Sequence, residues 1–310
     1  MLDKQILDIY DALDYPTSNA ERIIKLFRSS GYDLDIGITE AVGKAKTIFL
    51  KFCFPGTEGK CSGGSAPTLG VVGQLGGLGA APAKIGIVSD GDGAIAALAL
   101  ALKLTQMRTR GILLRGDIII TTHICMSAPL WVKKPVPYMG LPVDMVTMNR
   151  NLVDPAMDAI VSIDTTKGNR ILCHKGIAIT PTVKKGYILK VSENLMTILS
   201  NTTGELPYVM PITTQDITTY HNGLTHINSI LQPATLTGSP VIGLAITAQA
   251  VVPGCATGAS SAEDIELAAR FCLECAKVFP DEPDLFYDDA EYQEFVKRYG
   301  DLSFLCEIAE

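Results

Sequence analysis

The sequence predicts an α/β fold in which helices cover both faces of a central, mixed and mostly parallel sheet. Short β-branched runs, typical of buried strands, alternate with helical segments along most of the chain. Hydrophobic residues make up 47% of the 310 residues and charged residues only 19%, so a large core can form. We therefore expect a three-layer sandwich, in which the inner strands are buried on both faces.

The first elements that the sequence predicts are helical. Residues 3–30 hold two helical segments, and the second of them, Glu21–Ser30, ends at a glycine. The next element, Thr47–Phe54, is a strand that a Pro-Gly pair halts. Residues 56–83 are rich in glycine and small side chains, with GxxG spacings similar to those of phosphate-binding loops. They lack the GK[ST] motif and a clean GxGxxG after a strand, so a nucleotide site is not favoured.

The stretch from Lys84 to Leu104 predicts a strand, a turn and a helix in direct succession. Lys84–Ser89 is a β-branched run, and Ala94–Leu104 is apolar almost all round, which places this helix in the interior. Asp90 and Asp92, each followed by a glycine, stand between them. Free backbone N–H groups and the helix dipole favour negative charge there. The two carboxylates either cap the helix or belong to a functional site.

The rest of the core continues the alternation of strands and helices. Further strands are predicted at Gly116–Thr122, Ala159–Ile163, Ile177–Ile179 and Ser239–Ile246, and helices at Val191–Ser200 and from Ser261 to about Phe279. Ser261 begins a Ser-x-x-acid pattern that is typical of a helix N-terminus. Residues 214–230 predict a turn and the start of a helix, and they carry Asp216, His221 and His226.

Three polar residues directly follow predicted buried strands, namely Asp90, His123 and Asp164. Ligand sites of open α/β sheets collect at the carboxyl ends of the strands. Carboxylate and imidazole groups at three such ends predict a metal site or an acid–base site. The alternative is that each of them is a solvated loop residue.

The remaining candidate residues have weaker signals. His221 and His226 stand five positions apart, which does not align them on one helical face, so each is either a site member or an ordinary core or surface histidine. Cys125 and Cys255 are soft ligands or nucleophiles, or else buried structural thiols.

Composition excludes several functional classes. The net charge of -7 argues against nucleic acid, and the longest apolar run, Ala94–Leu102, is much shorter than the roughly 20 residues of a membrane span. Met1–Lys4 leads into a charged amphipathic segment instead of a secretory signal. The eight cysteines are scattered, so we expect free thiols and a cytoplasmic protein; the Cys272–Cys275 CxxC falls within a helix. Glycine-rich loops and the low charge content predict a homo-oligomer.

Three segments carry a resemblance to known families: SDGDGAIAALALALKL, VSIDTTKGN and TGSPVIGLAITAQAVVPGCATGASSAEDIELAARF. The chain resembles the co-catalytic zinc aminopeptidases of the glutamyl and deblocking type, and an uncharacterised bacterial family known only as a domain of unknown function. The resemblance spans roughly residues 45–280 and implies the phosphorylase/hydrolase-like fold. It places residues 1–310 in one α/β domain, with an N-terminal helical segment at 1–40 and a C-terminal helical tail at 281–310.

The resemblance also implies a metal site. In these peptidases an Asp at a strand-to-helix turn bridges two metals, and Asp90 is the better match to it, with Asp92 next. Asp164 matches an acidic ligand, and His226 lies in a segment similar to the Gly-Gly-Thr-Asp-Ala turn. The resemblance therefore implies Zn or Mn held by Asp90, Asp92, His123 and Asp164.

The sequence departs from the peptidase pattern at three places. The strand that should end in a Glu pair, a base and a ligand, offers Thr122 and His123 instead. The first metal His is replaced near Cys53, and the His of the last ligand loop has Cys255 as its best substitute. If these changes make the site degenerate, no metal is expected.

Two functions follow from these observations. The first is a metal-dependent hydrolase of small peptides or amino-acid amides, with His123 and His226 in acid–base roles and His221, Asp216 and Cys255 against the substrate. The second is a non-catalytic pseudo-peptidase, which binds a small peptide-like ligand or serves as a scaffold. The missing Glu base favours the second, and the polar residues at three strand ends favour the first.

Overall fold

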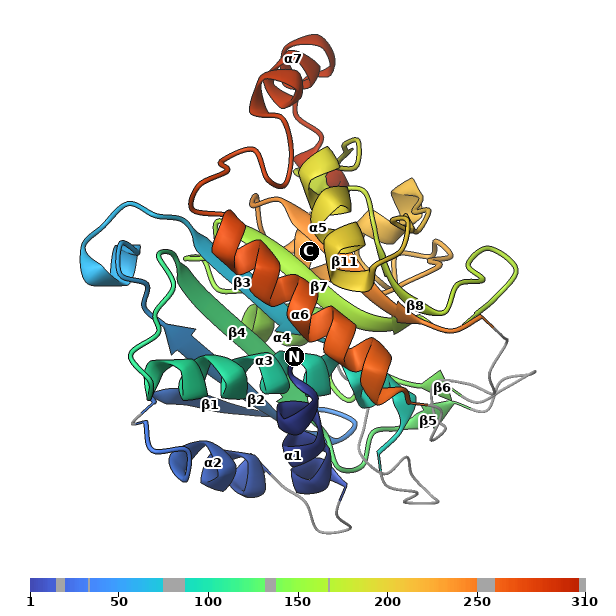
Figure 1. The fold of residues 1–310 in the computed structure, drawn as a ribbon. Helices are drawn as coiled ribbons and strands as arrows, with labels where there is room; N and C mark the ends of the chain where they lie inside the picture. The colour runs from blue at the N-terminus through green and yellow to red at the C-terminus, as the bar shows by residue number, and fades with distance from the viewer. Residues whose placement is uncertain are drawn as a thin grey trace.

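The computed structural model describes residues 1–14, 20–32, 34–74, 87–131, 138–166, 168–249 and 260–306. In this part of the chain a nine-stranded sheet lies between two layers of helices and turns, which confirms the predicted α/β fold (Figure 1). The sheet has the order β1-β2-β4-β3-β7-β11-β9-β10, and β8 pairs with β11. Its strands are β1 Ile36–Val42, β2 Lys46–Phe54, β3 Thr68–Gly73, β4 Asp117–Ile124, β7 Ala159–Thr166, β8 Gly176–Ile179, β9 Val183–Lys184, β10 Tyr187–Ile188 and β11 Val241–Thr247.

The sheet is mixed, and its centre is parallel. The strands β4, β3, β7 and β11 run parallel to one another, whereas β1, β2, β8, β9 and β10 are added antiparallel. The four parallel strands are buried along almost their whole length, as expected for strands covered on both faces. Two short strands, β5 Leu130–Trp131 and β6 Tyr138–Met139, form a separate hairpin.

Helices of unequal number cover the two faces. One face carries α1 Asp3–Leu13, α2 Ala20–Arg28, α3 Asp92–Arg108, α5 Glu193–Thr203 and α6 Ala262–Val278, and its side chains form the larger core cluster. In Figure 1, α3 and α6 cross the face of the sheet that is turned to the viewer. The other face carries α4 Met145–Leu152 and the 3₁₀ turns η3 Thr214–Ile217 and η4 Gln232–Thr235 over the second cluster. The remaining elements are α7 Asp289–Tyr299, η1 Lys60–Ser62, η2 Ser89–Gly91 and η5 Ser303–Leu305.

The apolar helix predicted at 94–104 forms the centre of the larger layer. As α3, it packs between the sheet, α1 and α6, and every residue from Asp92 to Leu102 is buried. Its first turn lies directly on the sheet: a Cβ on Gly93 would lie 2.5 Å from the Gln74 carbonyl oxygen and 2.6 Å from that of Ile163. Only glycine permits this close approach, so Gly93 allows the first turn of α3 to pack directly against the ends of β3 and β7.

The central strand β3 lies within the glycine-rich residues 56–83, where no strand was predicted. Its six residues, TLGVVG, are all buried between β4 and β7. A Cβ on Gly70 would collide with Met157, and one on Gly73 would lie 2.7 Å from the Ala97 Cβ. These glycines therefore serve close packing, not phosphate binding.

Three further differences from the predicted elements concern β1, residues 214–230 and the strand expected at Lys84–Ser89. The edge strand β1 was not predicted, and residues 214–230 hold only a single 3₁₀ turn in place of a helix start. Of the strand expected at Lys84–Ser89, the structure describes only the last three residues, and Ser89 already belongs to η2.

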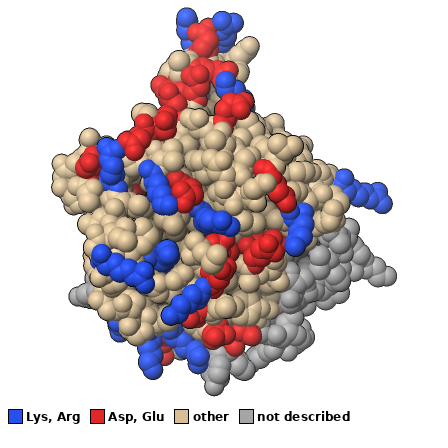
Figure 2. All heavy atoms as spheres, viewed as in Figure 1, with Lys and Arg blue, Asp and Glu red and all other residues tan. Residues whose placement is uncertain are grey.

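The helix start predicted at Ser261 is confirmed, because its side chain accepts from the Asp264 N–H at the start of α6. Ser192 accepts in the same way from the Leu195 N–H at the start of α5, and Gly204 ends α5 in the left-handed conformation. Among the described helices, none is both long and apolar enough to cross a membrane. Figure 2 shows acidic and basic side chains interspersed over the α3 and α6 face, without a basic stripe on that face.

Candidate functional site

The carboxyl ends of the four parallel strands meet at one edge of the sheet, and two predicted site residues lie there. His123 belongs to β4 and Asp164 to β7, so both stand within their strands and not after them. The strands are longer than predicted because strand pairing continues beyond the expected ends: Thr166 pairs with Thr247 of β11, and Ile124 pairs with Ile48 of β2.

The register places a third polar residue between these two. Gly73 lies opposite both Thr122 and Ile163, so the following residue, Gln74, has His123 on one side and Asp164 on the other. The Gln74 N–H donates to the Ile163 carbonyl over 2.8 Å, which continues the ladder by one residue. With neighbouring strands about 4.8 Å apart, Asp164 lies roughly 10 Å across the sheet from His123.

All three side chains face the α4 layer. Side chains alternate along a strand, and Ile119 and Ile160, which share the parity of His123 and Asp164, belong to the smaller core cluster on that face. Gln74 shares its parity with Val72 of the same cluster. We call His123, Gln74 and Asp164 the polar row. It brings together two predicted residues and one that was missed.

Asp164 is the member of the polar row whose pKa is clearly shifted. Its side chain is half-buried; one carboxylate oxygen accepts from the Ser229 hydroxyl at 2.8 Å and the other from the Thr165 N–H at 2.7 Å. Burial raises the pKa of Asp164 to about 6, even though both hydrogen bonds favour the ionised form. The carboxylate is therefore mostly ionised at pH 7 and close to the range in which it exchanges a proton.

The other two members of the row are almost fully buried. The His123 side chain is 1% exposed, and its ring lies 5.8 Å from that of Phe49 on β2. The Gln74 side chain is 8% exposed, and within the described residues its amide nitrogen has no hydrogen-bond partner. An amide nitrogen left in this way costs about 1–3 kcal/mol.

Asp90 and Asp92 lie on the other side of the sheet edge, at the start of α3. Asp92 is the first residue of α3 and is fully buried, and its Oδ1 accepts from the Ser260 hydroxyl at 2.5 Å. Since Ser260 directly precedes the Ser261 cap, this bond joins the starts of α3 and α6. Asp90 is half-buried within η2. The structure therefore gives Asp92 a bond between two helices and separates both residues from the polar row.

Asp216 and His226 organise a loop instead of facing the row. The buried Asp216 carboxylate accepts from the N–H groups of Thr213, Ile227 and Asn228 at 2.6–3.2 Å, which joins the two ends of the loop. The His226 Nε2 lies 3.0 Å from the Thr218 carbonyl oxygen, and its ring lies edge-on to Tyr220. Both side chains are thereby held by their own loop.

His221 lies at a separate pocket. The residue is exposed, has a positive φ of 70°, and lines a cavity of about 280 Å³ together with Asp144 and Asn149 of the α4 region.

Among the described residues, we find no cysteine that could serve as a nucleophile at the polar row. Burial raises the pKa of the thiols of Cys125, Cys272 and Cys275, so all three remain protonated at pH 7 and behave as structural thiols. Cys255 lies outside the described residues.

A zinc or manganese ion does not fit the donors that the described residues provide. Within them, no group of three or more His, Cys, Asp or Glu side chains is arranged to hold a metal ion. The Asp164 oxygens and the Asp92 Oδ1 already accept hydrogen bonds. Two segments outside the described residues follow β3 and β11 in the sequence: residues 75–86 contain no His, Cys, Asp or Glu, and residues 250–259 contain only Cys255.

Sequence reasoning missed Gln74 and Ser229. Gln74 directly follows the buried run TLGVVG, so the rule that selected Asp164 would also have selected Gln74 once that run was recognised as a strand. Ser229 stands in an irregular segment, and nothing local in the sequence indicates its bond to Asp164.

Comparisons with known proteins agree with the fold. A family model described as "Protein of unknown function (DUF1177)" matches residues 39–308, so the chain belongs to this family. No curated protein matches it. The solved structure of the bottromycin maturation enzyme BotP is 18% identical, with a TM-score of 0.52 over 88% of this chain and 70% of that one. BotP in complex with Mn is 15% identical, with a TM-score of 0.50 over 87% and 70%.

These comparisons confirm the predicted resemblance to a domain of unknown function. Membership of DUF1177 agrees with the resemblance to a domain of unknown function, and the likeness to BotP, at these identities, shows the fold alone. The resemblance to zinc aminopeptidases stays a prediction.

Proposed function

We propose that this member of the DUF1177 family binds a small peptide-like molecule at the carboxyl ends of β3 and β7. The observation that carries the proposal is the pair of Gln74 and Asp164, which the register puts side by side. Asp164 offers a hydrogen-bond acceptor, and Gln74 offers an amide nitrogen for which the described residues supply no acceptor. An amide group of a ligand carries the complementary donor and acceptor.

The loss of folding stability caused by Asp164 and Gln74 supports a functional role for this pair. A half-buried carboxylate and a buried amide nitrogen both reduce stability, and such costs concentrate at functional sites. The next positions across the sheet are Ala245 of β11 and Ala178 of β8, whose side chains are small and apolar. They leave Asp164 and Gln74 as the polar pair of their part of the row.

The experiment is a calorimetric titration with glycyl-L-alaninamide as the probe. We expect Asp164→Asn and Gln74→Met each to weaken binding at least tenfold, which is about 1.4 kcal/mol. Asp284→Asn, which makes the same chemical change at an exposed residue, serves as the control and should bind like the wild type. Equal affinity of Asp164→Asn and the wild type, or no binding of the probe at millimolar concentration, would contradict the proposal.

Hydrolysis of amino-acid amides is the second candidate, and the pKa of Asp164 favours it. A carboxylate whose pKa is raised to about 6 is a good general base near neutral pH. Activity should then rise as the pH increases through 6, because the base acts in its ionised form. Ammonia release from L-alaninamide between pH 4.5 and 8 tests this, and activity that survives in Asp164→Asn would refute it.

The metal-dependent form of this hydrolase has a direct test. One solved structure of similar fold is described as a complex with Mn, whereas the described residues here do not fit a metal. We therefore expect purified protein to contain less than stoichiometric zinc or manganese, and its melting temperature to stay unchanged when either is added. One metal per chain, together with a higher melting temperature, would restore the metal-dependent hydrolase.

A further inference from the structure

The strand β1 forms an open edge of the sheet. It pairs with β2 on one side, stands at the end of the strand order, and is exposed from Gly37 to Glu40 and at Val42. Natural edge strands are normally protected by proline, by bulges, by lysine or by short length. β1 is seven residues long, pairs with β2 without interruption, and contains neither proline nor lysine. Such an edge is suited to pairing with another strand.

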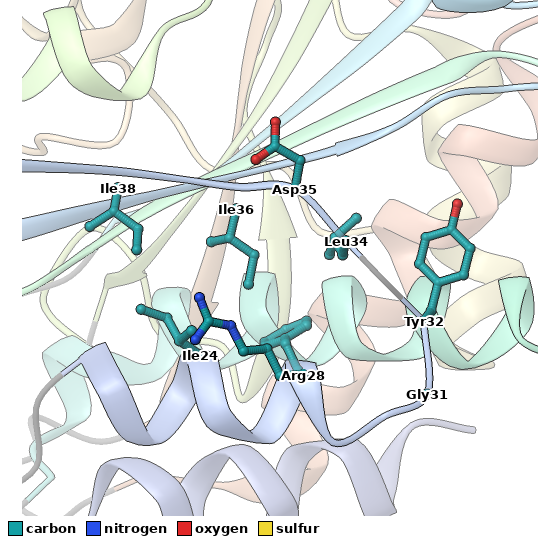
Figure 3. Close-up of a pocket in the computed structure, with 9 residues that line it drawn as sticks. Ile24, Arg28, Gly31, Tyr32, Leu34, Asp35, Ile36 and Ile38 are labelled. Atoms are coloured by element: carbon teal, nitrogen blue, oxygen red, sulfur yellow. The ribbon is translucent and has the colours of Figure 1, made fainter.

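The face that β1 turns to α2 carries exposed apolar side chains on either side of Glu40. Ile38 is 49% exposed and Val42 is 79% exposed, both at even positions of the strand. Beneath β1 lies a groove of about 630 Å³ whose apolar lining includes Ile24, Ile36 and Ile38. In Figure 3, Ile36 and Ile38 point toward α2, and Arg28 extends from α2 toward them. An added strand would cover this apolar surface.

The charges around β1 select an antiparallel partner of the same sequence. Asp35 precedes the strand and Lys44 follows it closely, so antiparallel pairing of two copies brings opposite charges together, whereas parallel pairing would bring like charges together. Full overlap of the seven residues places Ile36 opposite the partner's Val42 and Thr39 opposite itself. Ile38 then lies opposite the partner's Glu40, on the face toward which Arg28 extends.

We propose that β1 pairs antiparallel with β1 of a second copy of this chain, across a two-fold axis at Thr39, to form one continuous sheet. The pairing covers the exposed Ile38 and Val42 and brings the partner's Glu40 to Arg28, for which no ion pair is found among the described residues. Glu40 also forms an ion pair with Lys46 of its own chain over 2.9 Å, so Arg28 would be a second cation beside this carboxylate. An isologous contact of this kind closes as a dimer and leaves no further β1 edge open.

Sedimentation equilibrium of the full chain tests the pairing. We expect a dimer for the wild type and a monomer, or at least a hundredfold weaker dimer, for Ile38→Lys, because a lysine would stand at the centre of the paired edge. Leu206→Lys is the matched control: Leu206 is 90% exposed and lies far from β1 in the sequence, so this variant should remain dimeric. A monomeric wild type, or an Ile38→Lys variant with unchanged dimerisation and an unchanged circular dichroism spectrum, would overturn the proposal.

Disulfide trapping tests the register. In a background with the exposed Cys61 and Cys173 replaced by serine, Thr39→Cys should form a cross-linked dimer on oxidation. Residues directly opposite in antiparallel strands have Cα atoms about 4.5–5.5 Å apart, which suits a disulfide. Gly37→Cys is exposed on the same face, but the proposed register puts the two copies of residue 37 roughly 13 Å apart, so it should not cross-link. Cross-linking of Gly37→Cys without Thr39→Cys would refute this register.

Discussion

Replacing Asp164 with asparagine should stabilise the protein at neutral pH. Burial raises the pKa of this carboxyl from an ordinary 3.8 to about 6, which corresponds to roughly 3 kcal/mol. Because the folded state holds this proton more tightly than the unfolded state does, the contribution is favourable below pH 3.8. It is lost as the pH rises to about 6. Asparagine resembles the protonated acid and does not titrate, so the variant avoids this loss.

The assay is urea unfolding of the wild type and Asp164→Asn at several pH values from 4 to 8. The difference in the free energy of unfolding should be near zero at pH 4 and grow to about 2–3 kcal/mol in favour of the variant at pH 7. Other titrating groups cancel in this difference. A gap that does not change between pH 4 and pH 7 would refute the raised pKa, and with it the argument that burial keeps Asp164 close to proton exchange.

Three further changes test the packing and the structural roles assigned above. Gly93→Ala should lower the free energy of unfolding by about 2–4 kcal/mol, because its Cβ would lie 2.5 Å from the Gln74 carbonyl oxygen; urea unfolding measures this, and a loss below about 1 kcal/mol would contradict it. Asp216→Ala should cost about 2–4 kcal/mol in the same assay, since it leaves three backbone N–H groups without their acceptor; a neutral effect would exclude the structural role. Cys272 and Cys275 should stay unreactive toward a thiol reagent until the protein unfolds, as followed by mass spectrometry, and rapid labelling in native protein would contradict their burial.

Most helices, though not α4, and the strands β2, β4, β7, β8 and β11 were predictable because their signals are local. The apolar run of α3, the serines that begin α5 and α6, and the β-branched runs of β4, β7 and β11 each stand within a few residues of sequence. The strand β3 was hidden for an equally physical reason. It needs glycine at positions 70 and 73 to admit Met157 and Ala97, so its composition is similar to that of a loop.

The candidate site was only half predictable, because its geometry depends on register. His123 and Asp164 were found from the rule about strand ends, but Gln74 enters the polar row only once β3 is placed between β4 and β7. A shift of one residue in that pairing would turn Gln74 to the opposite face. Long-range register of this kind has no local sequence signal, which is also why Asp90 and Asp92 were expected beside the row.

The buried Asp216 and the half-buried Asp164 show how a structural carboxylate differs from a functional one. Asp216 accepts from three backbone N–H groups and the Thr213 hydroxyl, so its loop supplies nearly all the hydrogen bonds that a carboxylate can accept. Within the described part of the chain, Asp164 accepts only from the Ser229 hydroxyl and the Thr165 N–H, and its pKa is raised. Substitution should therefore destabilise at Asp216 and stabilise at Asp164. If Asp164→Asn is more stable than the wild type but no longer binds the amide probe, the wild type keeps a destabilising carboxylate because it binds the ligand. If the variant binds the probe normally, the polar row is a structural feature and the ligand site must be sought elsewhere.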